Sequence, residues 1–269
     1  MPFALSISIL GLVQAALVAL PAPRRRPGWI DRLSSPWWAL VPALSIGVVI
    51  AVIELDSDSA TWLSYLALVA VPPLAAFALG ALLHRSLPAW ALAALPLFAL
   101  AWASPHSLAG EAAATALSGL GCVTLGWLLV CVVPAHWLRL GVYAMAAIDA
   151  YSVASDLLQG PNAVLNAAAP AGGLPRLQAV HFGSALMGFG DLFVAALVGC
   201  LLAADGPQTD EMDRFAARRQ EVGALLVLGL ALGFDLLFFA VDELPATVPV
   251  ALALALVQGR DRVRAAARA

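Results

Sequence analysis

Residues 180–203 read VHFGSALMGFGDLFVAALVGCLLA, an apolar run that carries one carboxylate, Asp191, and no Lys or Arg. Its length matches the roughly 20 residues that an α-helix needs to cross the hydrocarbon core of a bilayer. An ionised carboxylate at the bilayer centre costs on the order of 3 kcal/mol, so such a residue needs a partner or a function. This stretch therefore predicts a membrane helix that contains a functional acid.

Eight further apolar runs accompany it. Of the 269 residues of the chain, 62% are hydrophobic and 12% are charged, whereas a soluble domain carries roughly 25% charged residues. A soluble protein of this composition would expose large apolar patches and aggregate, so we expect lipid to be its main solvent. The nine expected spans are Phe3–Leu20, Pro36–Ile53, Ala60–Leu83, Ala89–Ala103, Ala114–Val133, Trp137–Ser155, Val180–Ala203, Val222–Val241 and Pro245–Val257.

Continuous apolar runs favour helices, because backbone groups without hydrogen bonds are costly in lipid. We therefore predict an all-α, polytopic membrane protein with nine transmembrane helices in one structural unit. Residues 1–136 would supply helices one to five as a scaffold, and residues 137–269 would supply helices six to nine. The one long outer connection, Asp156–Ala179, is rich in Gly and Pro and is expected to be flexible.

The arginines orient this expected bundle. All 14 basic residues are Arg, and with nine spans all but Arg176 fall in the loops of one side. Loops rich in Arg mark the cytoplasmic side of a membrane protein. We therefore expect a multi-pass protein of the cell membrane with its N-terminus outside and its C-terminus in the cytoplasm. The arginines form no patterned basic face, so no nucleic-acid partner is expected.

Three acids lie inside expected spans: Asp149 in the sixth, Asp191 in the seventh and Asp235 in the eighth. Two carboxyls that share a proton can stay in the membrane, because one remains neutral and hydrogen-bonds the other. Asp149 and Asp191 suit such a pair, since their helices run antiparallel and their levels differ by roughly 8 Å at a rise of 1.5 Å per residue. In aspartic proteases one acid takes a proton from water while the other protonates the substrate carbonyl.

Three motifs resemble the presenilin and signal peptide peptidase family of intramembrane aspartyl proteases, with the archaeal-type members closest in look. Gly188-Phe189-Gly190-Asp191 matches the family's GxGD motif, and Asp149-Ala150-Tyr151 looks like its Asp-containing sixth helix. Pro245-Ala246-Thr247 resembles the PAL motif, although Thr247 replaces the leucine and Ile148 stands where the family often has tyrosine. The resemblance covers Leu140–Leu256.

This resemblance implies a presenilin-like fold and an endopeptidase that cuts within transmembrane segments. Asp149 and Asp191 would be the catalytic pair, and the residues that shape the substrate site would be Gly188, Phe189, Gly190, Pro245, Ala246 and Thr247. Substrates would be transmembrane proteins or signal peptides, with no cofactor and no metal; the oligomeric state stays open. Pro245 breaks the start of the ninth helix, so its free backbone could pair with an unwound substrate segment.

Alternatives remain at this stage. Asp235 is either a modulator of the aspartate pair or a hydrated structural acid. The same GxGD aspartate also occurs in prepilin peptidases, which cleave a different substrate. A proton-coupled transporter would use buried acids as relays, although such folds usually carry internal repeats, which this sequence lacks.

Overall fold

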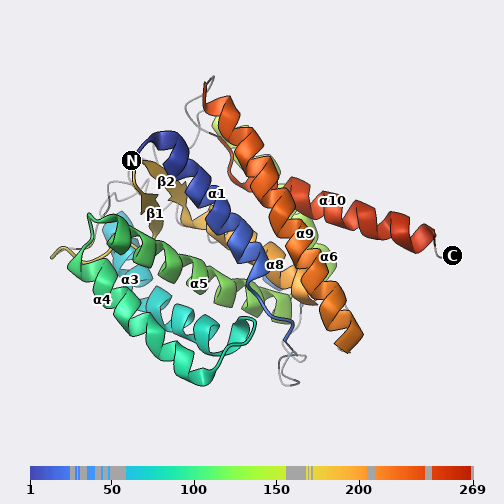
Figure 1. Ribbon diagram of the computed structural model, residues 1–269, viewed down its shortest axis with the longest axis horizontal. Helices are drawn as coiled ribbons and strands as arrows, with labels where there is room; N and C mark the ends of the chain where they lie inside the picture. The colour runs from blue at the N-terminus through green and yellow to red at the C-terminus, as the bar shows by residue number, and fades with distance from the viewer. Residues whose placement is uncertain are drawn as a thin grey trace.

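The computed structural model of the chain is mostly helical (Figure 1). It describes residues 1–24, 28, 30, 35–39, 44, 48, 59–155, 168, 170, 172–204, 210–239 and 244–267. Within these ranges the chain forms eight α-helices and one antiparallel sheet of two strands. The helical class predicted from the sequence is therefore confirmed. Most of the expected second span and most of the loop Asp156–Ala179 lie outside the described residues; Pro36–Ala39, at the start of that span, form a 3-10 turn.

The helices follow the expected apolar runs with shifted ends. They are α1 (Phe3–Ala19), α3 (Ser59–Phe77), α4 (Ala94–Ala103), α5 (Leu108–Val132), α6 (Ala135–Ala154), α8 (Phe189–Ala204), α9 (Asp210–Asp235) and α10 (Thr247–Ala266). A π-helical segment, Ala78–Leu82, extends α3, and 3-10 turns at Pro88–Ala93 and Leu236–Phe239 adjoin α4 and α9. Runs of Ala and Leu explain these elements, because both residues have high helix propensity.

A capping residue explains why α5 begins ahead of its expected start at Ala114. Ser107 precedes the helix in extended conformation, and its hydroxyl accepts a hydrogen bond from the backbone N–H of Gly110 at 3.1 Å. A serine in this position satisfies one of the free N–H groups at a helix start. The polar first turn of α5, which includes Glu111, therefore belongs to the helix.

The expected seventh span is not one continuous helix. Its first part forms a hairpin of β1 (Ala179–Phe182) and β2 (Ala185–Gly188), and α8 begins only at Phe189. The prediction of a helix from Val180 is therefore wrong. As a consequence, Asp191 lies in the first turn of α8 and not near the middle of a span.

The turn of this hairpin has identifiable causes. Gly183 has a φ of 61°, a left-handed conformation that glycine adopts without steric cost and that two-residue hairpin turns require. The backbone N–H of Gly183 donates to the Glu111 carboxylate at 2.7 Å, and the N–H of Ser184 donates to the hydroxyl of Ser6 at 3.2 Å. Side chains of α1 and α5 thus hold the turn in place, a contribution that hydropathy alone does not reveal.

Small residues let α8 pack closely at the centre of the molecule. A Cβ added at Gly199 would lie 2.5 Å from the carbonyl oxygen of Leu17 in α1, and one added at Gly126 of α5 would lie 3.1 Å from the backbone of Leu197. Close backbone approach at small residues is typical of packed membrane helices. α8 is accordingly buried between α1, α5 and α9, and it carries the candidate site at its first turn.

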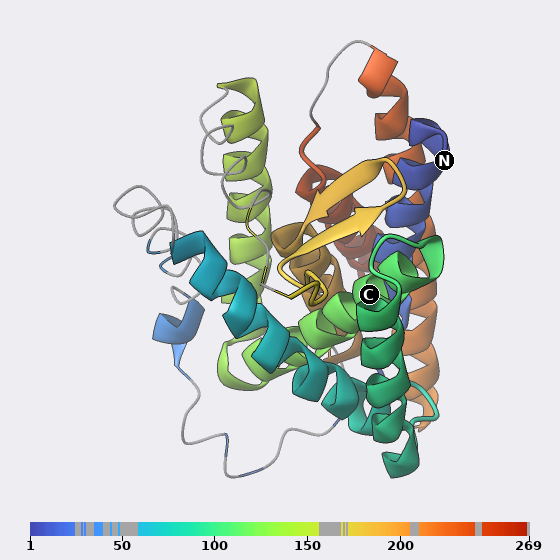
Figure 2. The same cartoon turned by 90° about the vertical axis from the view of Figure 1, so that its left-hand side faces the viewer.

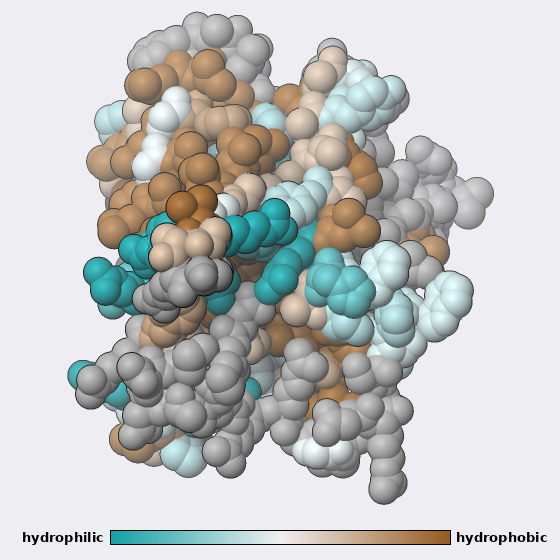
Figure 3. Space-filling model, turned by 90° about the vertical axis from the view of Figure 1, so that its right-hand side faces the viewer, coloured by the Kyte–Doolittle hydropathy of each residue, from teal (hydrophilic) through white to brown (hydrophobic). Residues whose placement is uncertain are grey.

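The described part of the chain contains three helices long and apolar enough to cross a membrane: Ser59–Leu82, Leu108–Val132 and Phe215–Phe238. Shorter apolar helices cover Phe3–Ala19, Pro88–Ala103 and Phe189–Ala204. Figure 3 shows hydrophilic side chains gathered in a band across the face at which α10 ends, beside a broad hydrophobic surface. These features agree with the expected membrane environment in its coarse form.

Candidate active site

Asp149 lies near the end of α6 and is held by the start of α10. The half-buried carboxylate accepts a hydrogen bond from the Thr247 hydroxyl at 2.6 Å and one from the Thr247 backbone N–H at 3.3 Å. Both bonds reach the same oxygen, Oδ2. Asp149 therefore serves as a hydrogen-bond acceptor for the first residue of a neighbouring helix.

The sequence around Thr247 explains why a helix begins there. Pro245 and Ala246 precede α10, and a proline is tolerated only at or before the first turn of a helix. The first N–H groups of a helix have no partner within it and favour a negatively charged neighbour. Asp149 meets this need from α6, with the Thr247 hydroxyl as an additional donor.

The backbone of the Pro245-Ala246-Thr247 motif is less open than the sequence predicted. The Ala246 carbonyl accepts from the Gln14 side chain of α1 at 3.2 Å, and the Thr247 N–H is bonded to Asp149. The Pro245 carbonyl accepts from the Val248 N–H at 3.2 Å. These groups are therefore engaged within the protein and are not free to pair with a substrate strand.

Asp191 is held at the N-terminus of its own helix. Its Oδ2 accepts from the backbone N–H of Gly188 at 3.1 Å, which is the reach-back bond of a capping box. A Cβ added at Gly188 would lie 3.1 Å from the same oxygen, whereas one added at Gly190 would meet no atom within 4 Å. Gly188 thus leaves room for the carboxylate, and Gly190 leaves open space beside it. Phe189, between them, is half-buried, and the Cys122 thiol contacts its carbonyl at 3.9 Å.

The two predicted acids lie on neighbouring parts of the structure. Asp149 and Asp191 are near enough for their charges to interact. The pair belongs to α6 and α8, at the level where α10 begins. In Figure 2 the hairpin is seen between α6 and α1, with the start of α8 beneath it. Strand β2 therefore leads directly into the turn that carries Asp191.

Asp235 is placed elsewhere. It is the last residue of α9, and its carboxylate accepts a hydrogen bond from the Ser8 hydroxyl of α1 at 3.4 Å. The nearby rings of Phe3 and Phe238 pack edge to face, with centroids 5.1 Å apart. The structure thus gives Asp235 a partner in α1, and its expected role as a modulator of the pair gains no contact to support it among the described residues.

Two glutamines that the sequence analysis did not single out support the site. The Gln14 side chain donates to the Ala246 carbonyl, and the Gln258 side chain of α10 accepts from the Tyr143 hydroxyl of α6 at 3.2 Å. The second bond joins α6 and α10 at a position further along α10 than the contact between Asp149 and Thr247. A polar residue within an apolar run is the signal that could have drawn attention to both glutamines.

Comparisons with known proteins found no match: no family model, no curated protein and no solved structure matches the chain. Any assignment of function must therefore come from the residues and their geometry. The described residues contain no group of three or more His, Cys, Asp and Glu side chains placed to hold a metal ion. Among these residues, the arrangement with the clearest chemical capacity is the aspartate pair.

Proposed function

We propose that the protein is an intramembrane aspartyl endopeptidase of the GxGD type, with Asp149 and Asp191 as its catalytic pair. The observation that carries the proposal is the proximity of these two carboxyl groups, which come from different helices. Two carboxyls that approach each other closely cannot both ionise readily, so the pair would hold one proton between them once a substrate and a water are bound. That state is the one aspartic proteases use.

The pair would hydrolyse a peptide bond by general acid–base catalysis. The ionised carboxylate takes a proton from a water molecule, whose oxygen forms a bond to the carbonyl carbon, while the neutral carboxyl gives its proton to the carbonyl oxygen. In the tetrahedral intermediate, the carboxyl that took the proton from water gives it to the nitrogen as the C–N bond breaks, and the other carboxylate takes a proton from a hydroxyl of the intermediate. The products are a carboxylic acid and an amine, and the pair returns to its single-proton state.

The hairpin offers a way to present the substrate. A two-residue turn makes Phe182 and Ala185 a hydrogen-bonded pair, so the register directs the backbone groups of Leu186 and Gly188 away from β1. The bond from Gly188 N–H to Asp191 agrees with this direction. An extended segment could add to this edge as a further strand, which would lead its peptide bonds toward Asp191.

We further propose nine membrane spans with the N-terminus outside and the C-terminus in the cytoplasm. The support is the distribution of arginine, since nearly all of the 14 basic residues fall on one side of such a bundle. This orientation is the one found in signal peptide peptidase. By the logic of that family, substrates would be single-span segments with a cytoplasmic N-terminus.

Cleavage by the purified protein tests the proposal. The wild-type protein in liposomes, incubated with a labelled transmembrane segment, should release two peptides, and an aspartyl-protease transition-state inhibitor should prevent this. Asp149→Asn and Asp191→Asn should each abolish cleavage while eluting as folded protein. Asp235→Asn is the matched acid-to-amide control, expected to retain activity because its bond to Ser8 lies outside the pair.

Full cleavage by either pair variant would reject the proposal. Proton flux through the liposomes without any peptide cleavage would favour the transporter alternative instead. Processing confined to the leader of a pilin-like substrate would favour the prepilin-peptidase alternative.

A further inference from the structure

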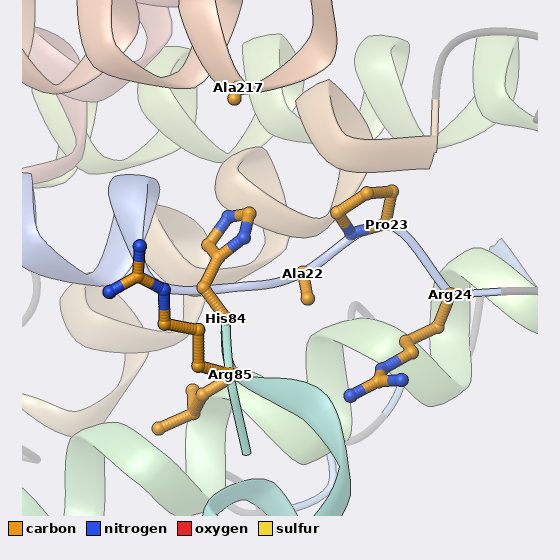
Figure 4. A pocket seen from close by; sticks show the side chains of 7 residues that line it. Ala22, Pro23, Arg24, His84, Arg85 and Ala217 are labelled. Atoms are coloured by element: carbon orange, nitrogen blue, oxygen red, sulfur yellow. The ribbon is translucent and has the colours of Figure 1, made fainter. Parts of the chain in front are cut away.

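A basic pocket lies at the opposite end of α1 from the hairpin and the aspartate pair. It has a volume of about 390 Å³ and is formed by the segment after α1, the turn after the π-helical segment and one position of α9. Figure 4 shows the side chains that line it. They are Ala22, Pro23, Arg24, Leu83, His84, Arg85 and Ala217.

Backbone hydrogen bonds fix the walls of this pocket. The N–H of Ala22 donates to the Leu82 carbonyl at 2.7 Å, and the N–H of His84 donates to the Leu20 carbonyl at 3.4 Å. The Gln220 side chain of α9 donates to the Pro21 carbonyl at 2.7 Å. The two chain segments and α9 are thus joined before any ligand arrives, and a preformed site loses little entropy on binding.

Arg85 has an unusual backbone conformation at the edge of the pocket. Its φ is 59°, and it is the one residue other than glycine with positive φ among those the structure describes. Such a conformation costs free energy, and residues that adopt it cluster at functional sites. The conformation sets where the Arg85 side chain leaves the turn.

The lining carries positive charge and no carboxylate. In Figure 4 the side chains of Arg24 and Arg85 lie on opposite sides of His84 and Ala22. Arg24 donates to the Ser86 hydroxyl at 2.9 Å, and neither arginine has a carboxylate partner among the described residues. Guanidinium groups bind phosphate through paired, charge-assisted hydrogen bonds, so the chemistry of the lining favours a phosphate group.

Exposed apolar residues lie close in the sequence to the residues that line the pocket. Leu20 precedes one wall, and Leu87 and Trp90 follow the other, with 58% and 57% of their surfaces exposed. Tryptophan is enriched at the membrane–water interface, where its ring contacts both headgroups and acyl chains. A phosphate ligand that also bears apolar chains matches both parts of this surface.

We propose that the pocket binds the headgroup of an anionic phospholipid of the cytoplasmic leaflet. Basic pockets between membrane helices on the cytoplasmic side bind anionic headgroups. In the orientation proposed from the arginines, on which this inference rests, the pocket faces the cytoplasm. Arg24 and Arg85 hold the phosphate, and the acyl chains lie along Leu87 and Trp90. The site is separate from the aspartate pair and requires membrane insertion, not proteolysis.

Native mass spectrometry of the purified protein with phosphatidylglycerol or phosphatidylcholine in mixed micelles tests this site. The wild-type protein should retain one phosphatidylglycerol in preference to phosphatidylcholine. Arg24→Gln combined with Arg85→Gln should weaken this retention at least about tenfold, since two charge-assisted contacts are lost. The matched control is Arg262→Gln combined with Arg264→Gln, which removes equal charge from exposed positions of α10 and should change retention less than about twofold.

Equal loss in both double variants would overturn the proposal, because it would indicate nonspecific charge attraction. Equal retention of both lipids by the wild-type protein would also overturn it. Displacement of the lipid by millimolar inorganic phosphate would identify a free-anion site instead of a lipid site. If the glutamine variant fails to fold, Arg24→Lys combined with Arg85→Lys keeps the charge but removes the planar donors, and undiminished lipid retention would then refute the proposed role of the guanidinium groups.

Discussion

Thr247→Val removes one hydroxyl from the candidate site with little change in shape. The lost bond is the 2.6 Å contact to Asp149, while the backbone N–H of residue 247 still donates to the same oxygen. A hydrogen bond to a charged group contributes about 1.5–3 kcal/mol, which corresponds to roughly 10- to 150-fold in rate if the bond is needed in the transition state. We therefore expect kcat to fall at least about tenfold.

The assay is cleavage of a labelled transmembrane segment in liposomes, with kcat and KM measured separately. KM should change less than about threefold, because the hydroxyl would orient a carboxyl of the proposed catalytic pair and its loss would act on the chemical step. Thr247→Ser keeps the hydroxyl and should restore most of the activity. Thr124→Val is the matched control, since the Thr124 hydroxyl donates to the Leu74 carbonyl at 2.7 Å, between α5 and α3.

A Thr247→Val protein that cleaves within about threefold of the wild-type rate would refute this reasoning. So would an equal loss in Thr124→Val, because the effect would then follow from a general loosening of the helices. A failure of Thr247→Ser to recover activity would show that the hydroxyl alone is not sufficient and that the methyl group is also needed at this position.

Two further predictions concern the hairpin and the start of α8, and a third concerns the orientation proposed from the arginines. Gly188→Ala should lower kcat roughly tenfold, because the added Cβ would lie 3.1 Å from the Asp191 carboxylate and displace it. Gly190→Ala is its control and should fold and bind inhibitor normally, since the added Cβ meets no atom within 4 Å. Gly183→Ala should destabilise the hairpin by roughly 1–2 kcal/mol, because residue 183 has a φ of 61°. Amide hydrogen exchange across residues 179–188 should become faster, and unchanged exchange would contradict the role given to this turn. A fluorescent protein fused after Ala269 should fluoresce in the cytoplasm while an alkaline phosphatase fusion stays inactive, and the reverse pattern would reject the proposed orientation.

Apolar runs predicted the helices well because hydrophobicity and helix propensity agree in them. They failed at residues 180–188, where the run is equally apolar but forms a hairpin. The deciding interactions there come from distant parts of the chain: the Glu111 carboxylate of α5 and the Ser6 hydroxyl of α1 bind the turn at Gly183 and Ser184. Local hydropathy does not predict these long-range contacts. The sequence did hold one sign of a turn, the Gly183-Ser184 pair after Val180-His181-Phe182, which contains a β-branched and an aromatic residue.

That Asp149 and Asp191 lie near each other was predictable, because a carboxyl in an apolar run needs a partner and the sequence offers few. The contribution of Thr247 was not predictable from the resemblance, which treated this residue as a departure from a leucine. Its hydroxyl gains a role only when α6 and α10 lie side by side, and that packing depends on contacts such as Tyr143 with Gln258. Spacing along the sequence therefore identified the acids, but only the tertiary structure identified the donors that hold them.

The helix ends explain why Asp149 and Asp191 differ from the third acid. Asp191 lies in the first turn of α8, and Asp149 binds the first residue of α10, so both carboxylates face N-termini, where free N–H groups and the helix dipole stabilise negative charge. Asp235 is instead the last residue of α9, at the end of a helix that repels a negative charge, and its one described donor is the Ser8 hydroxyl. Backbone N–H groups thus give these two carboxylates hydrogen bonds that water molecules would provide at an exposed site. The same donors that stabilise these carboxylates in an apolar protein also fix their orientation, which the proposed proton transfer would require.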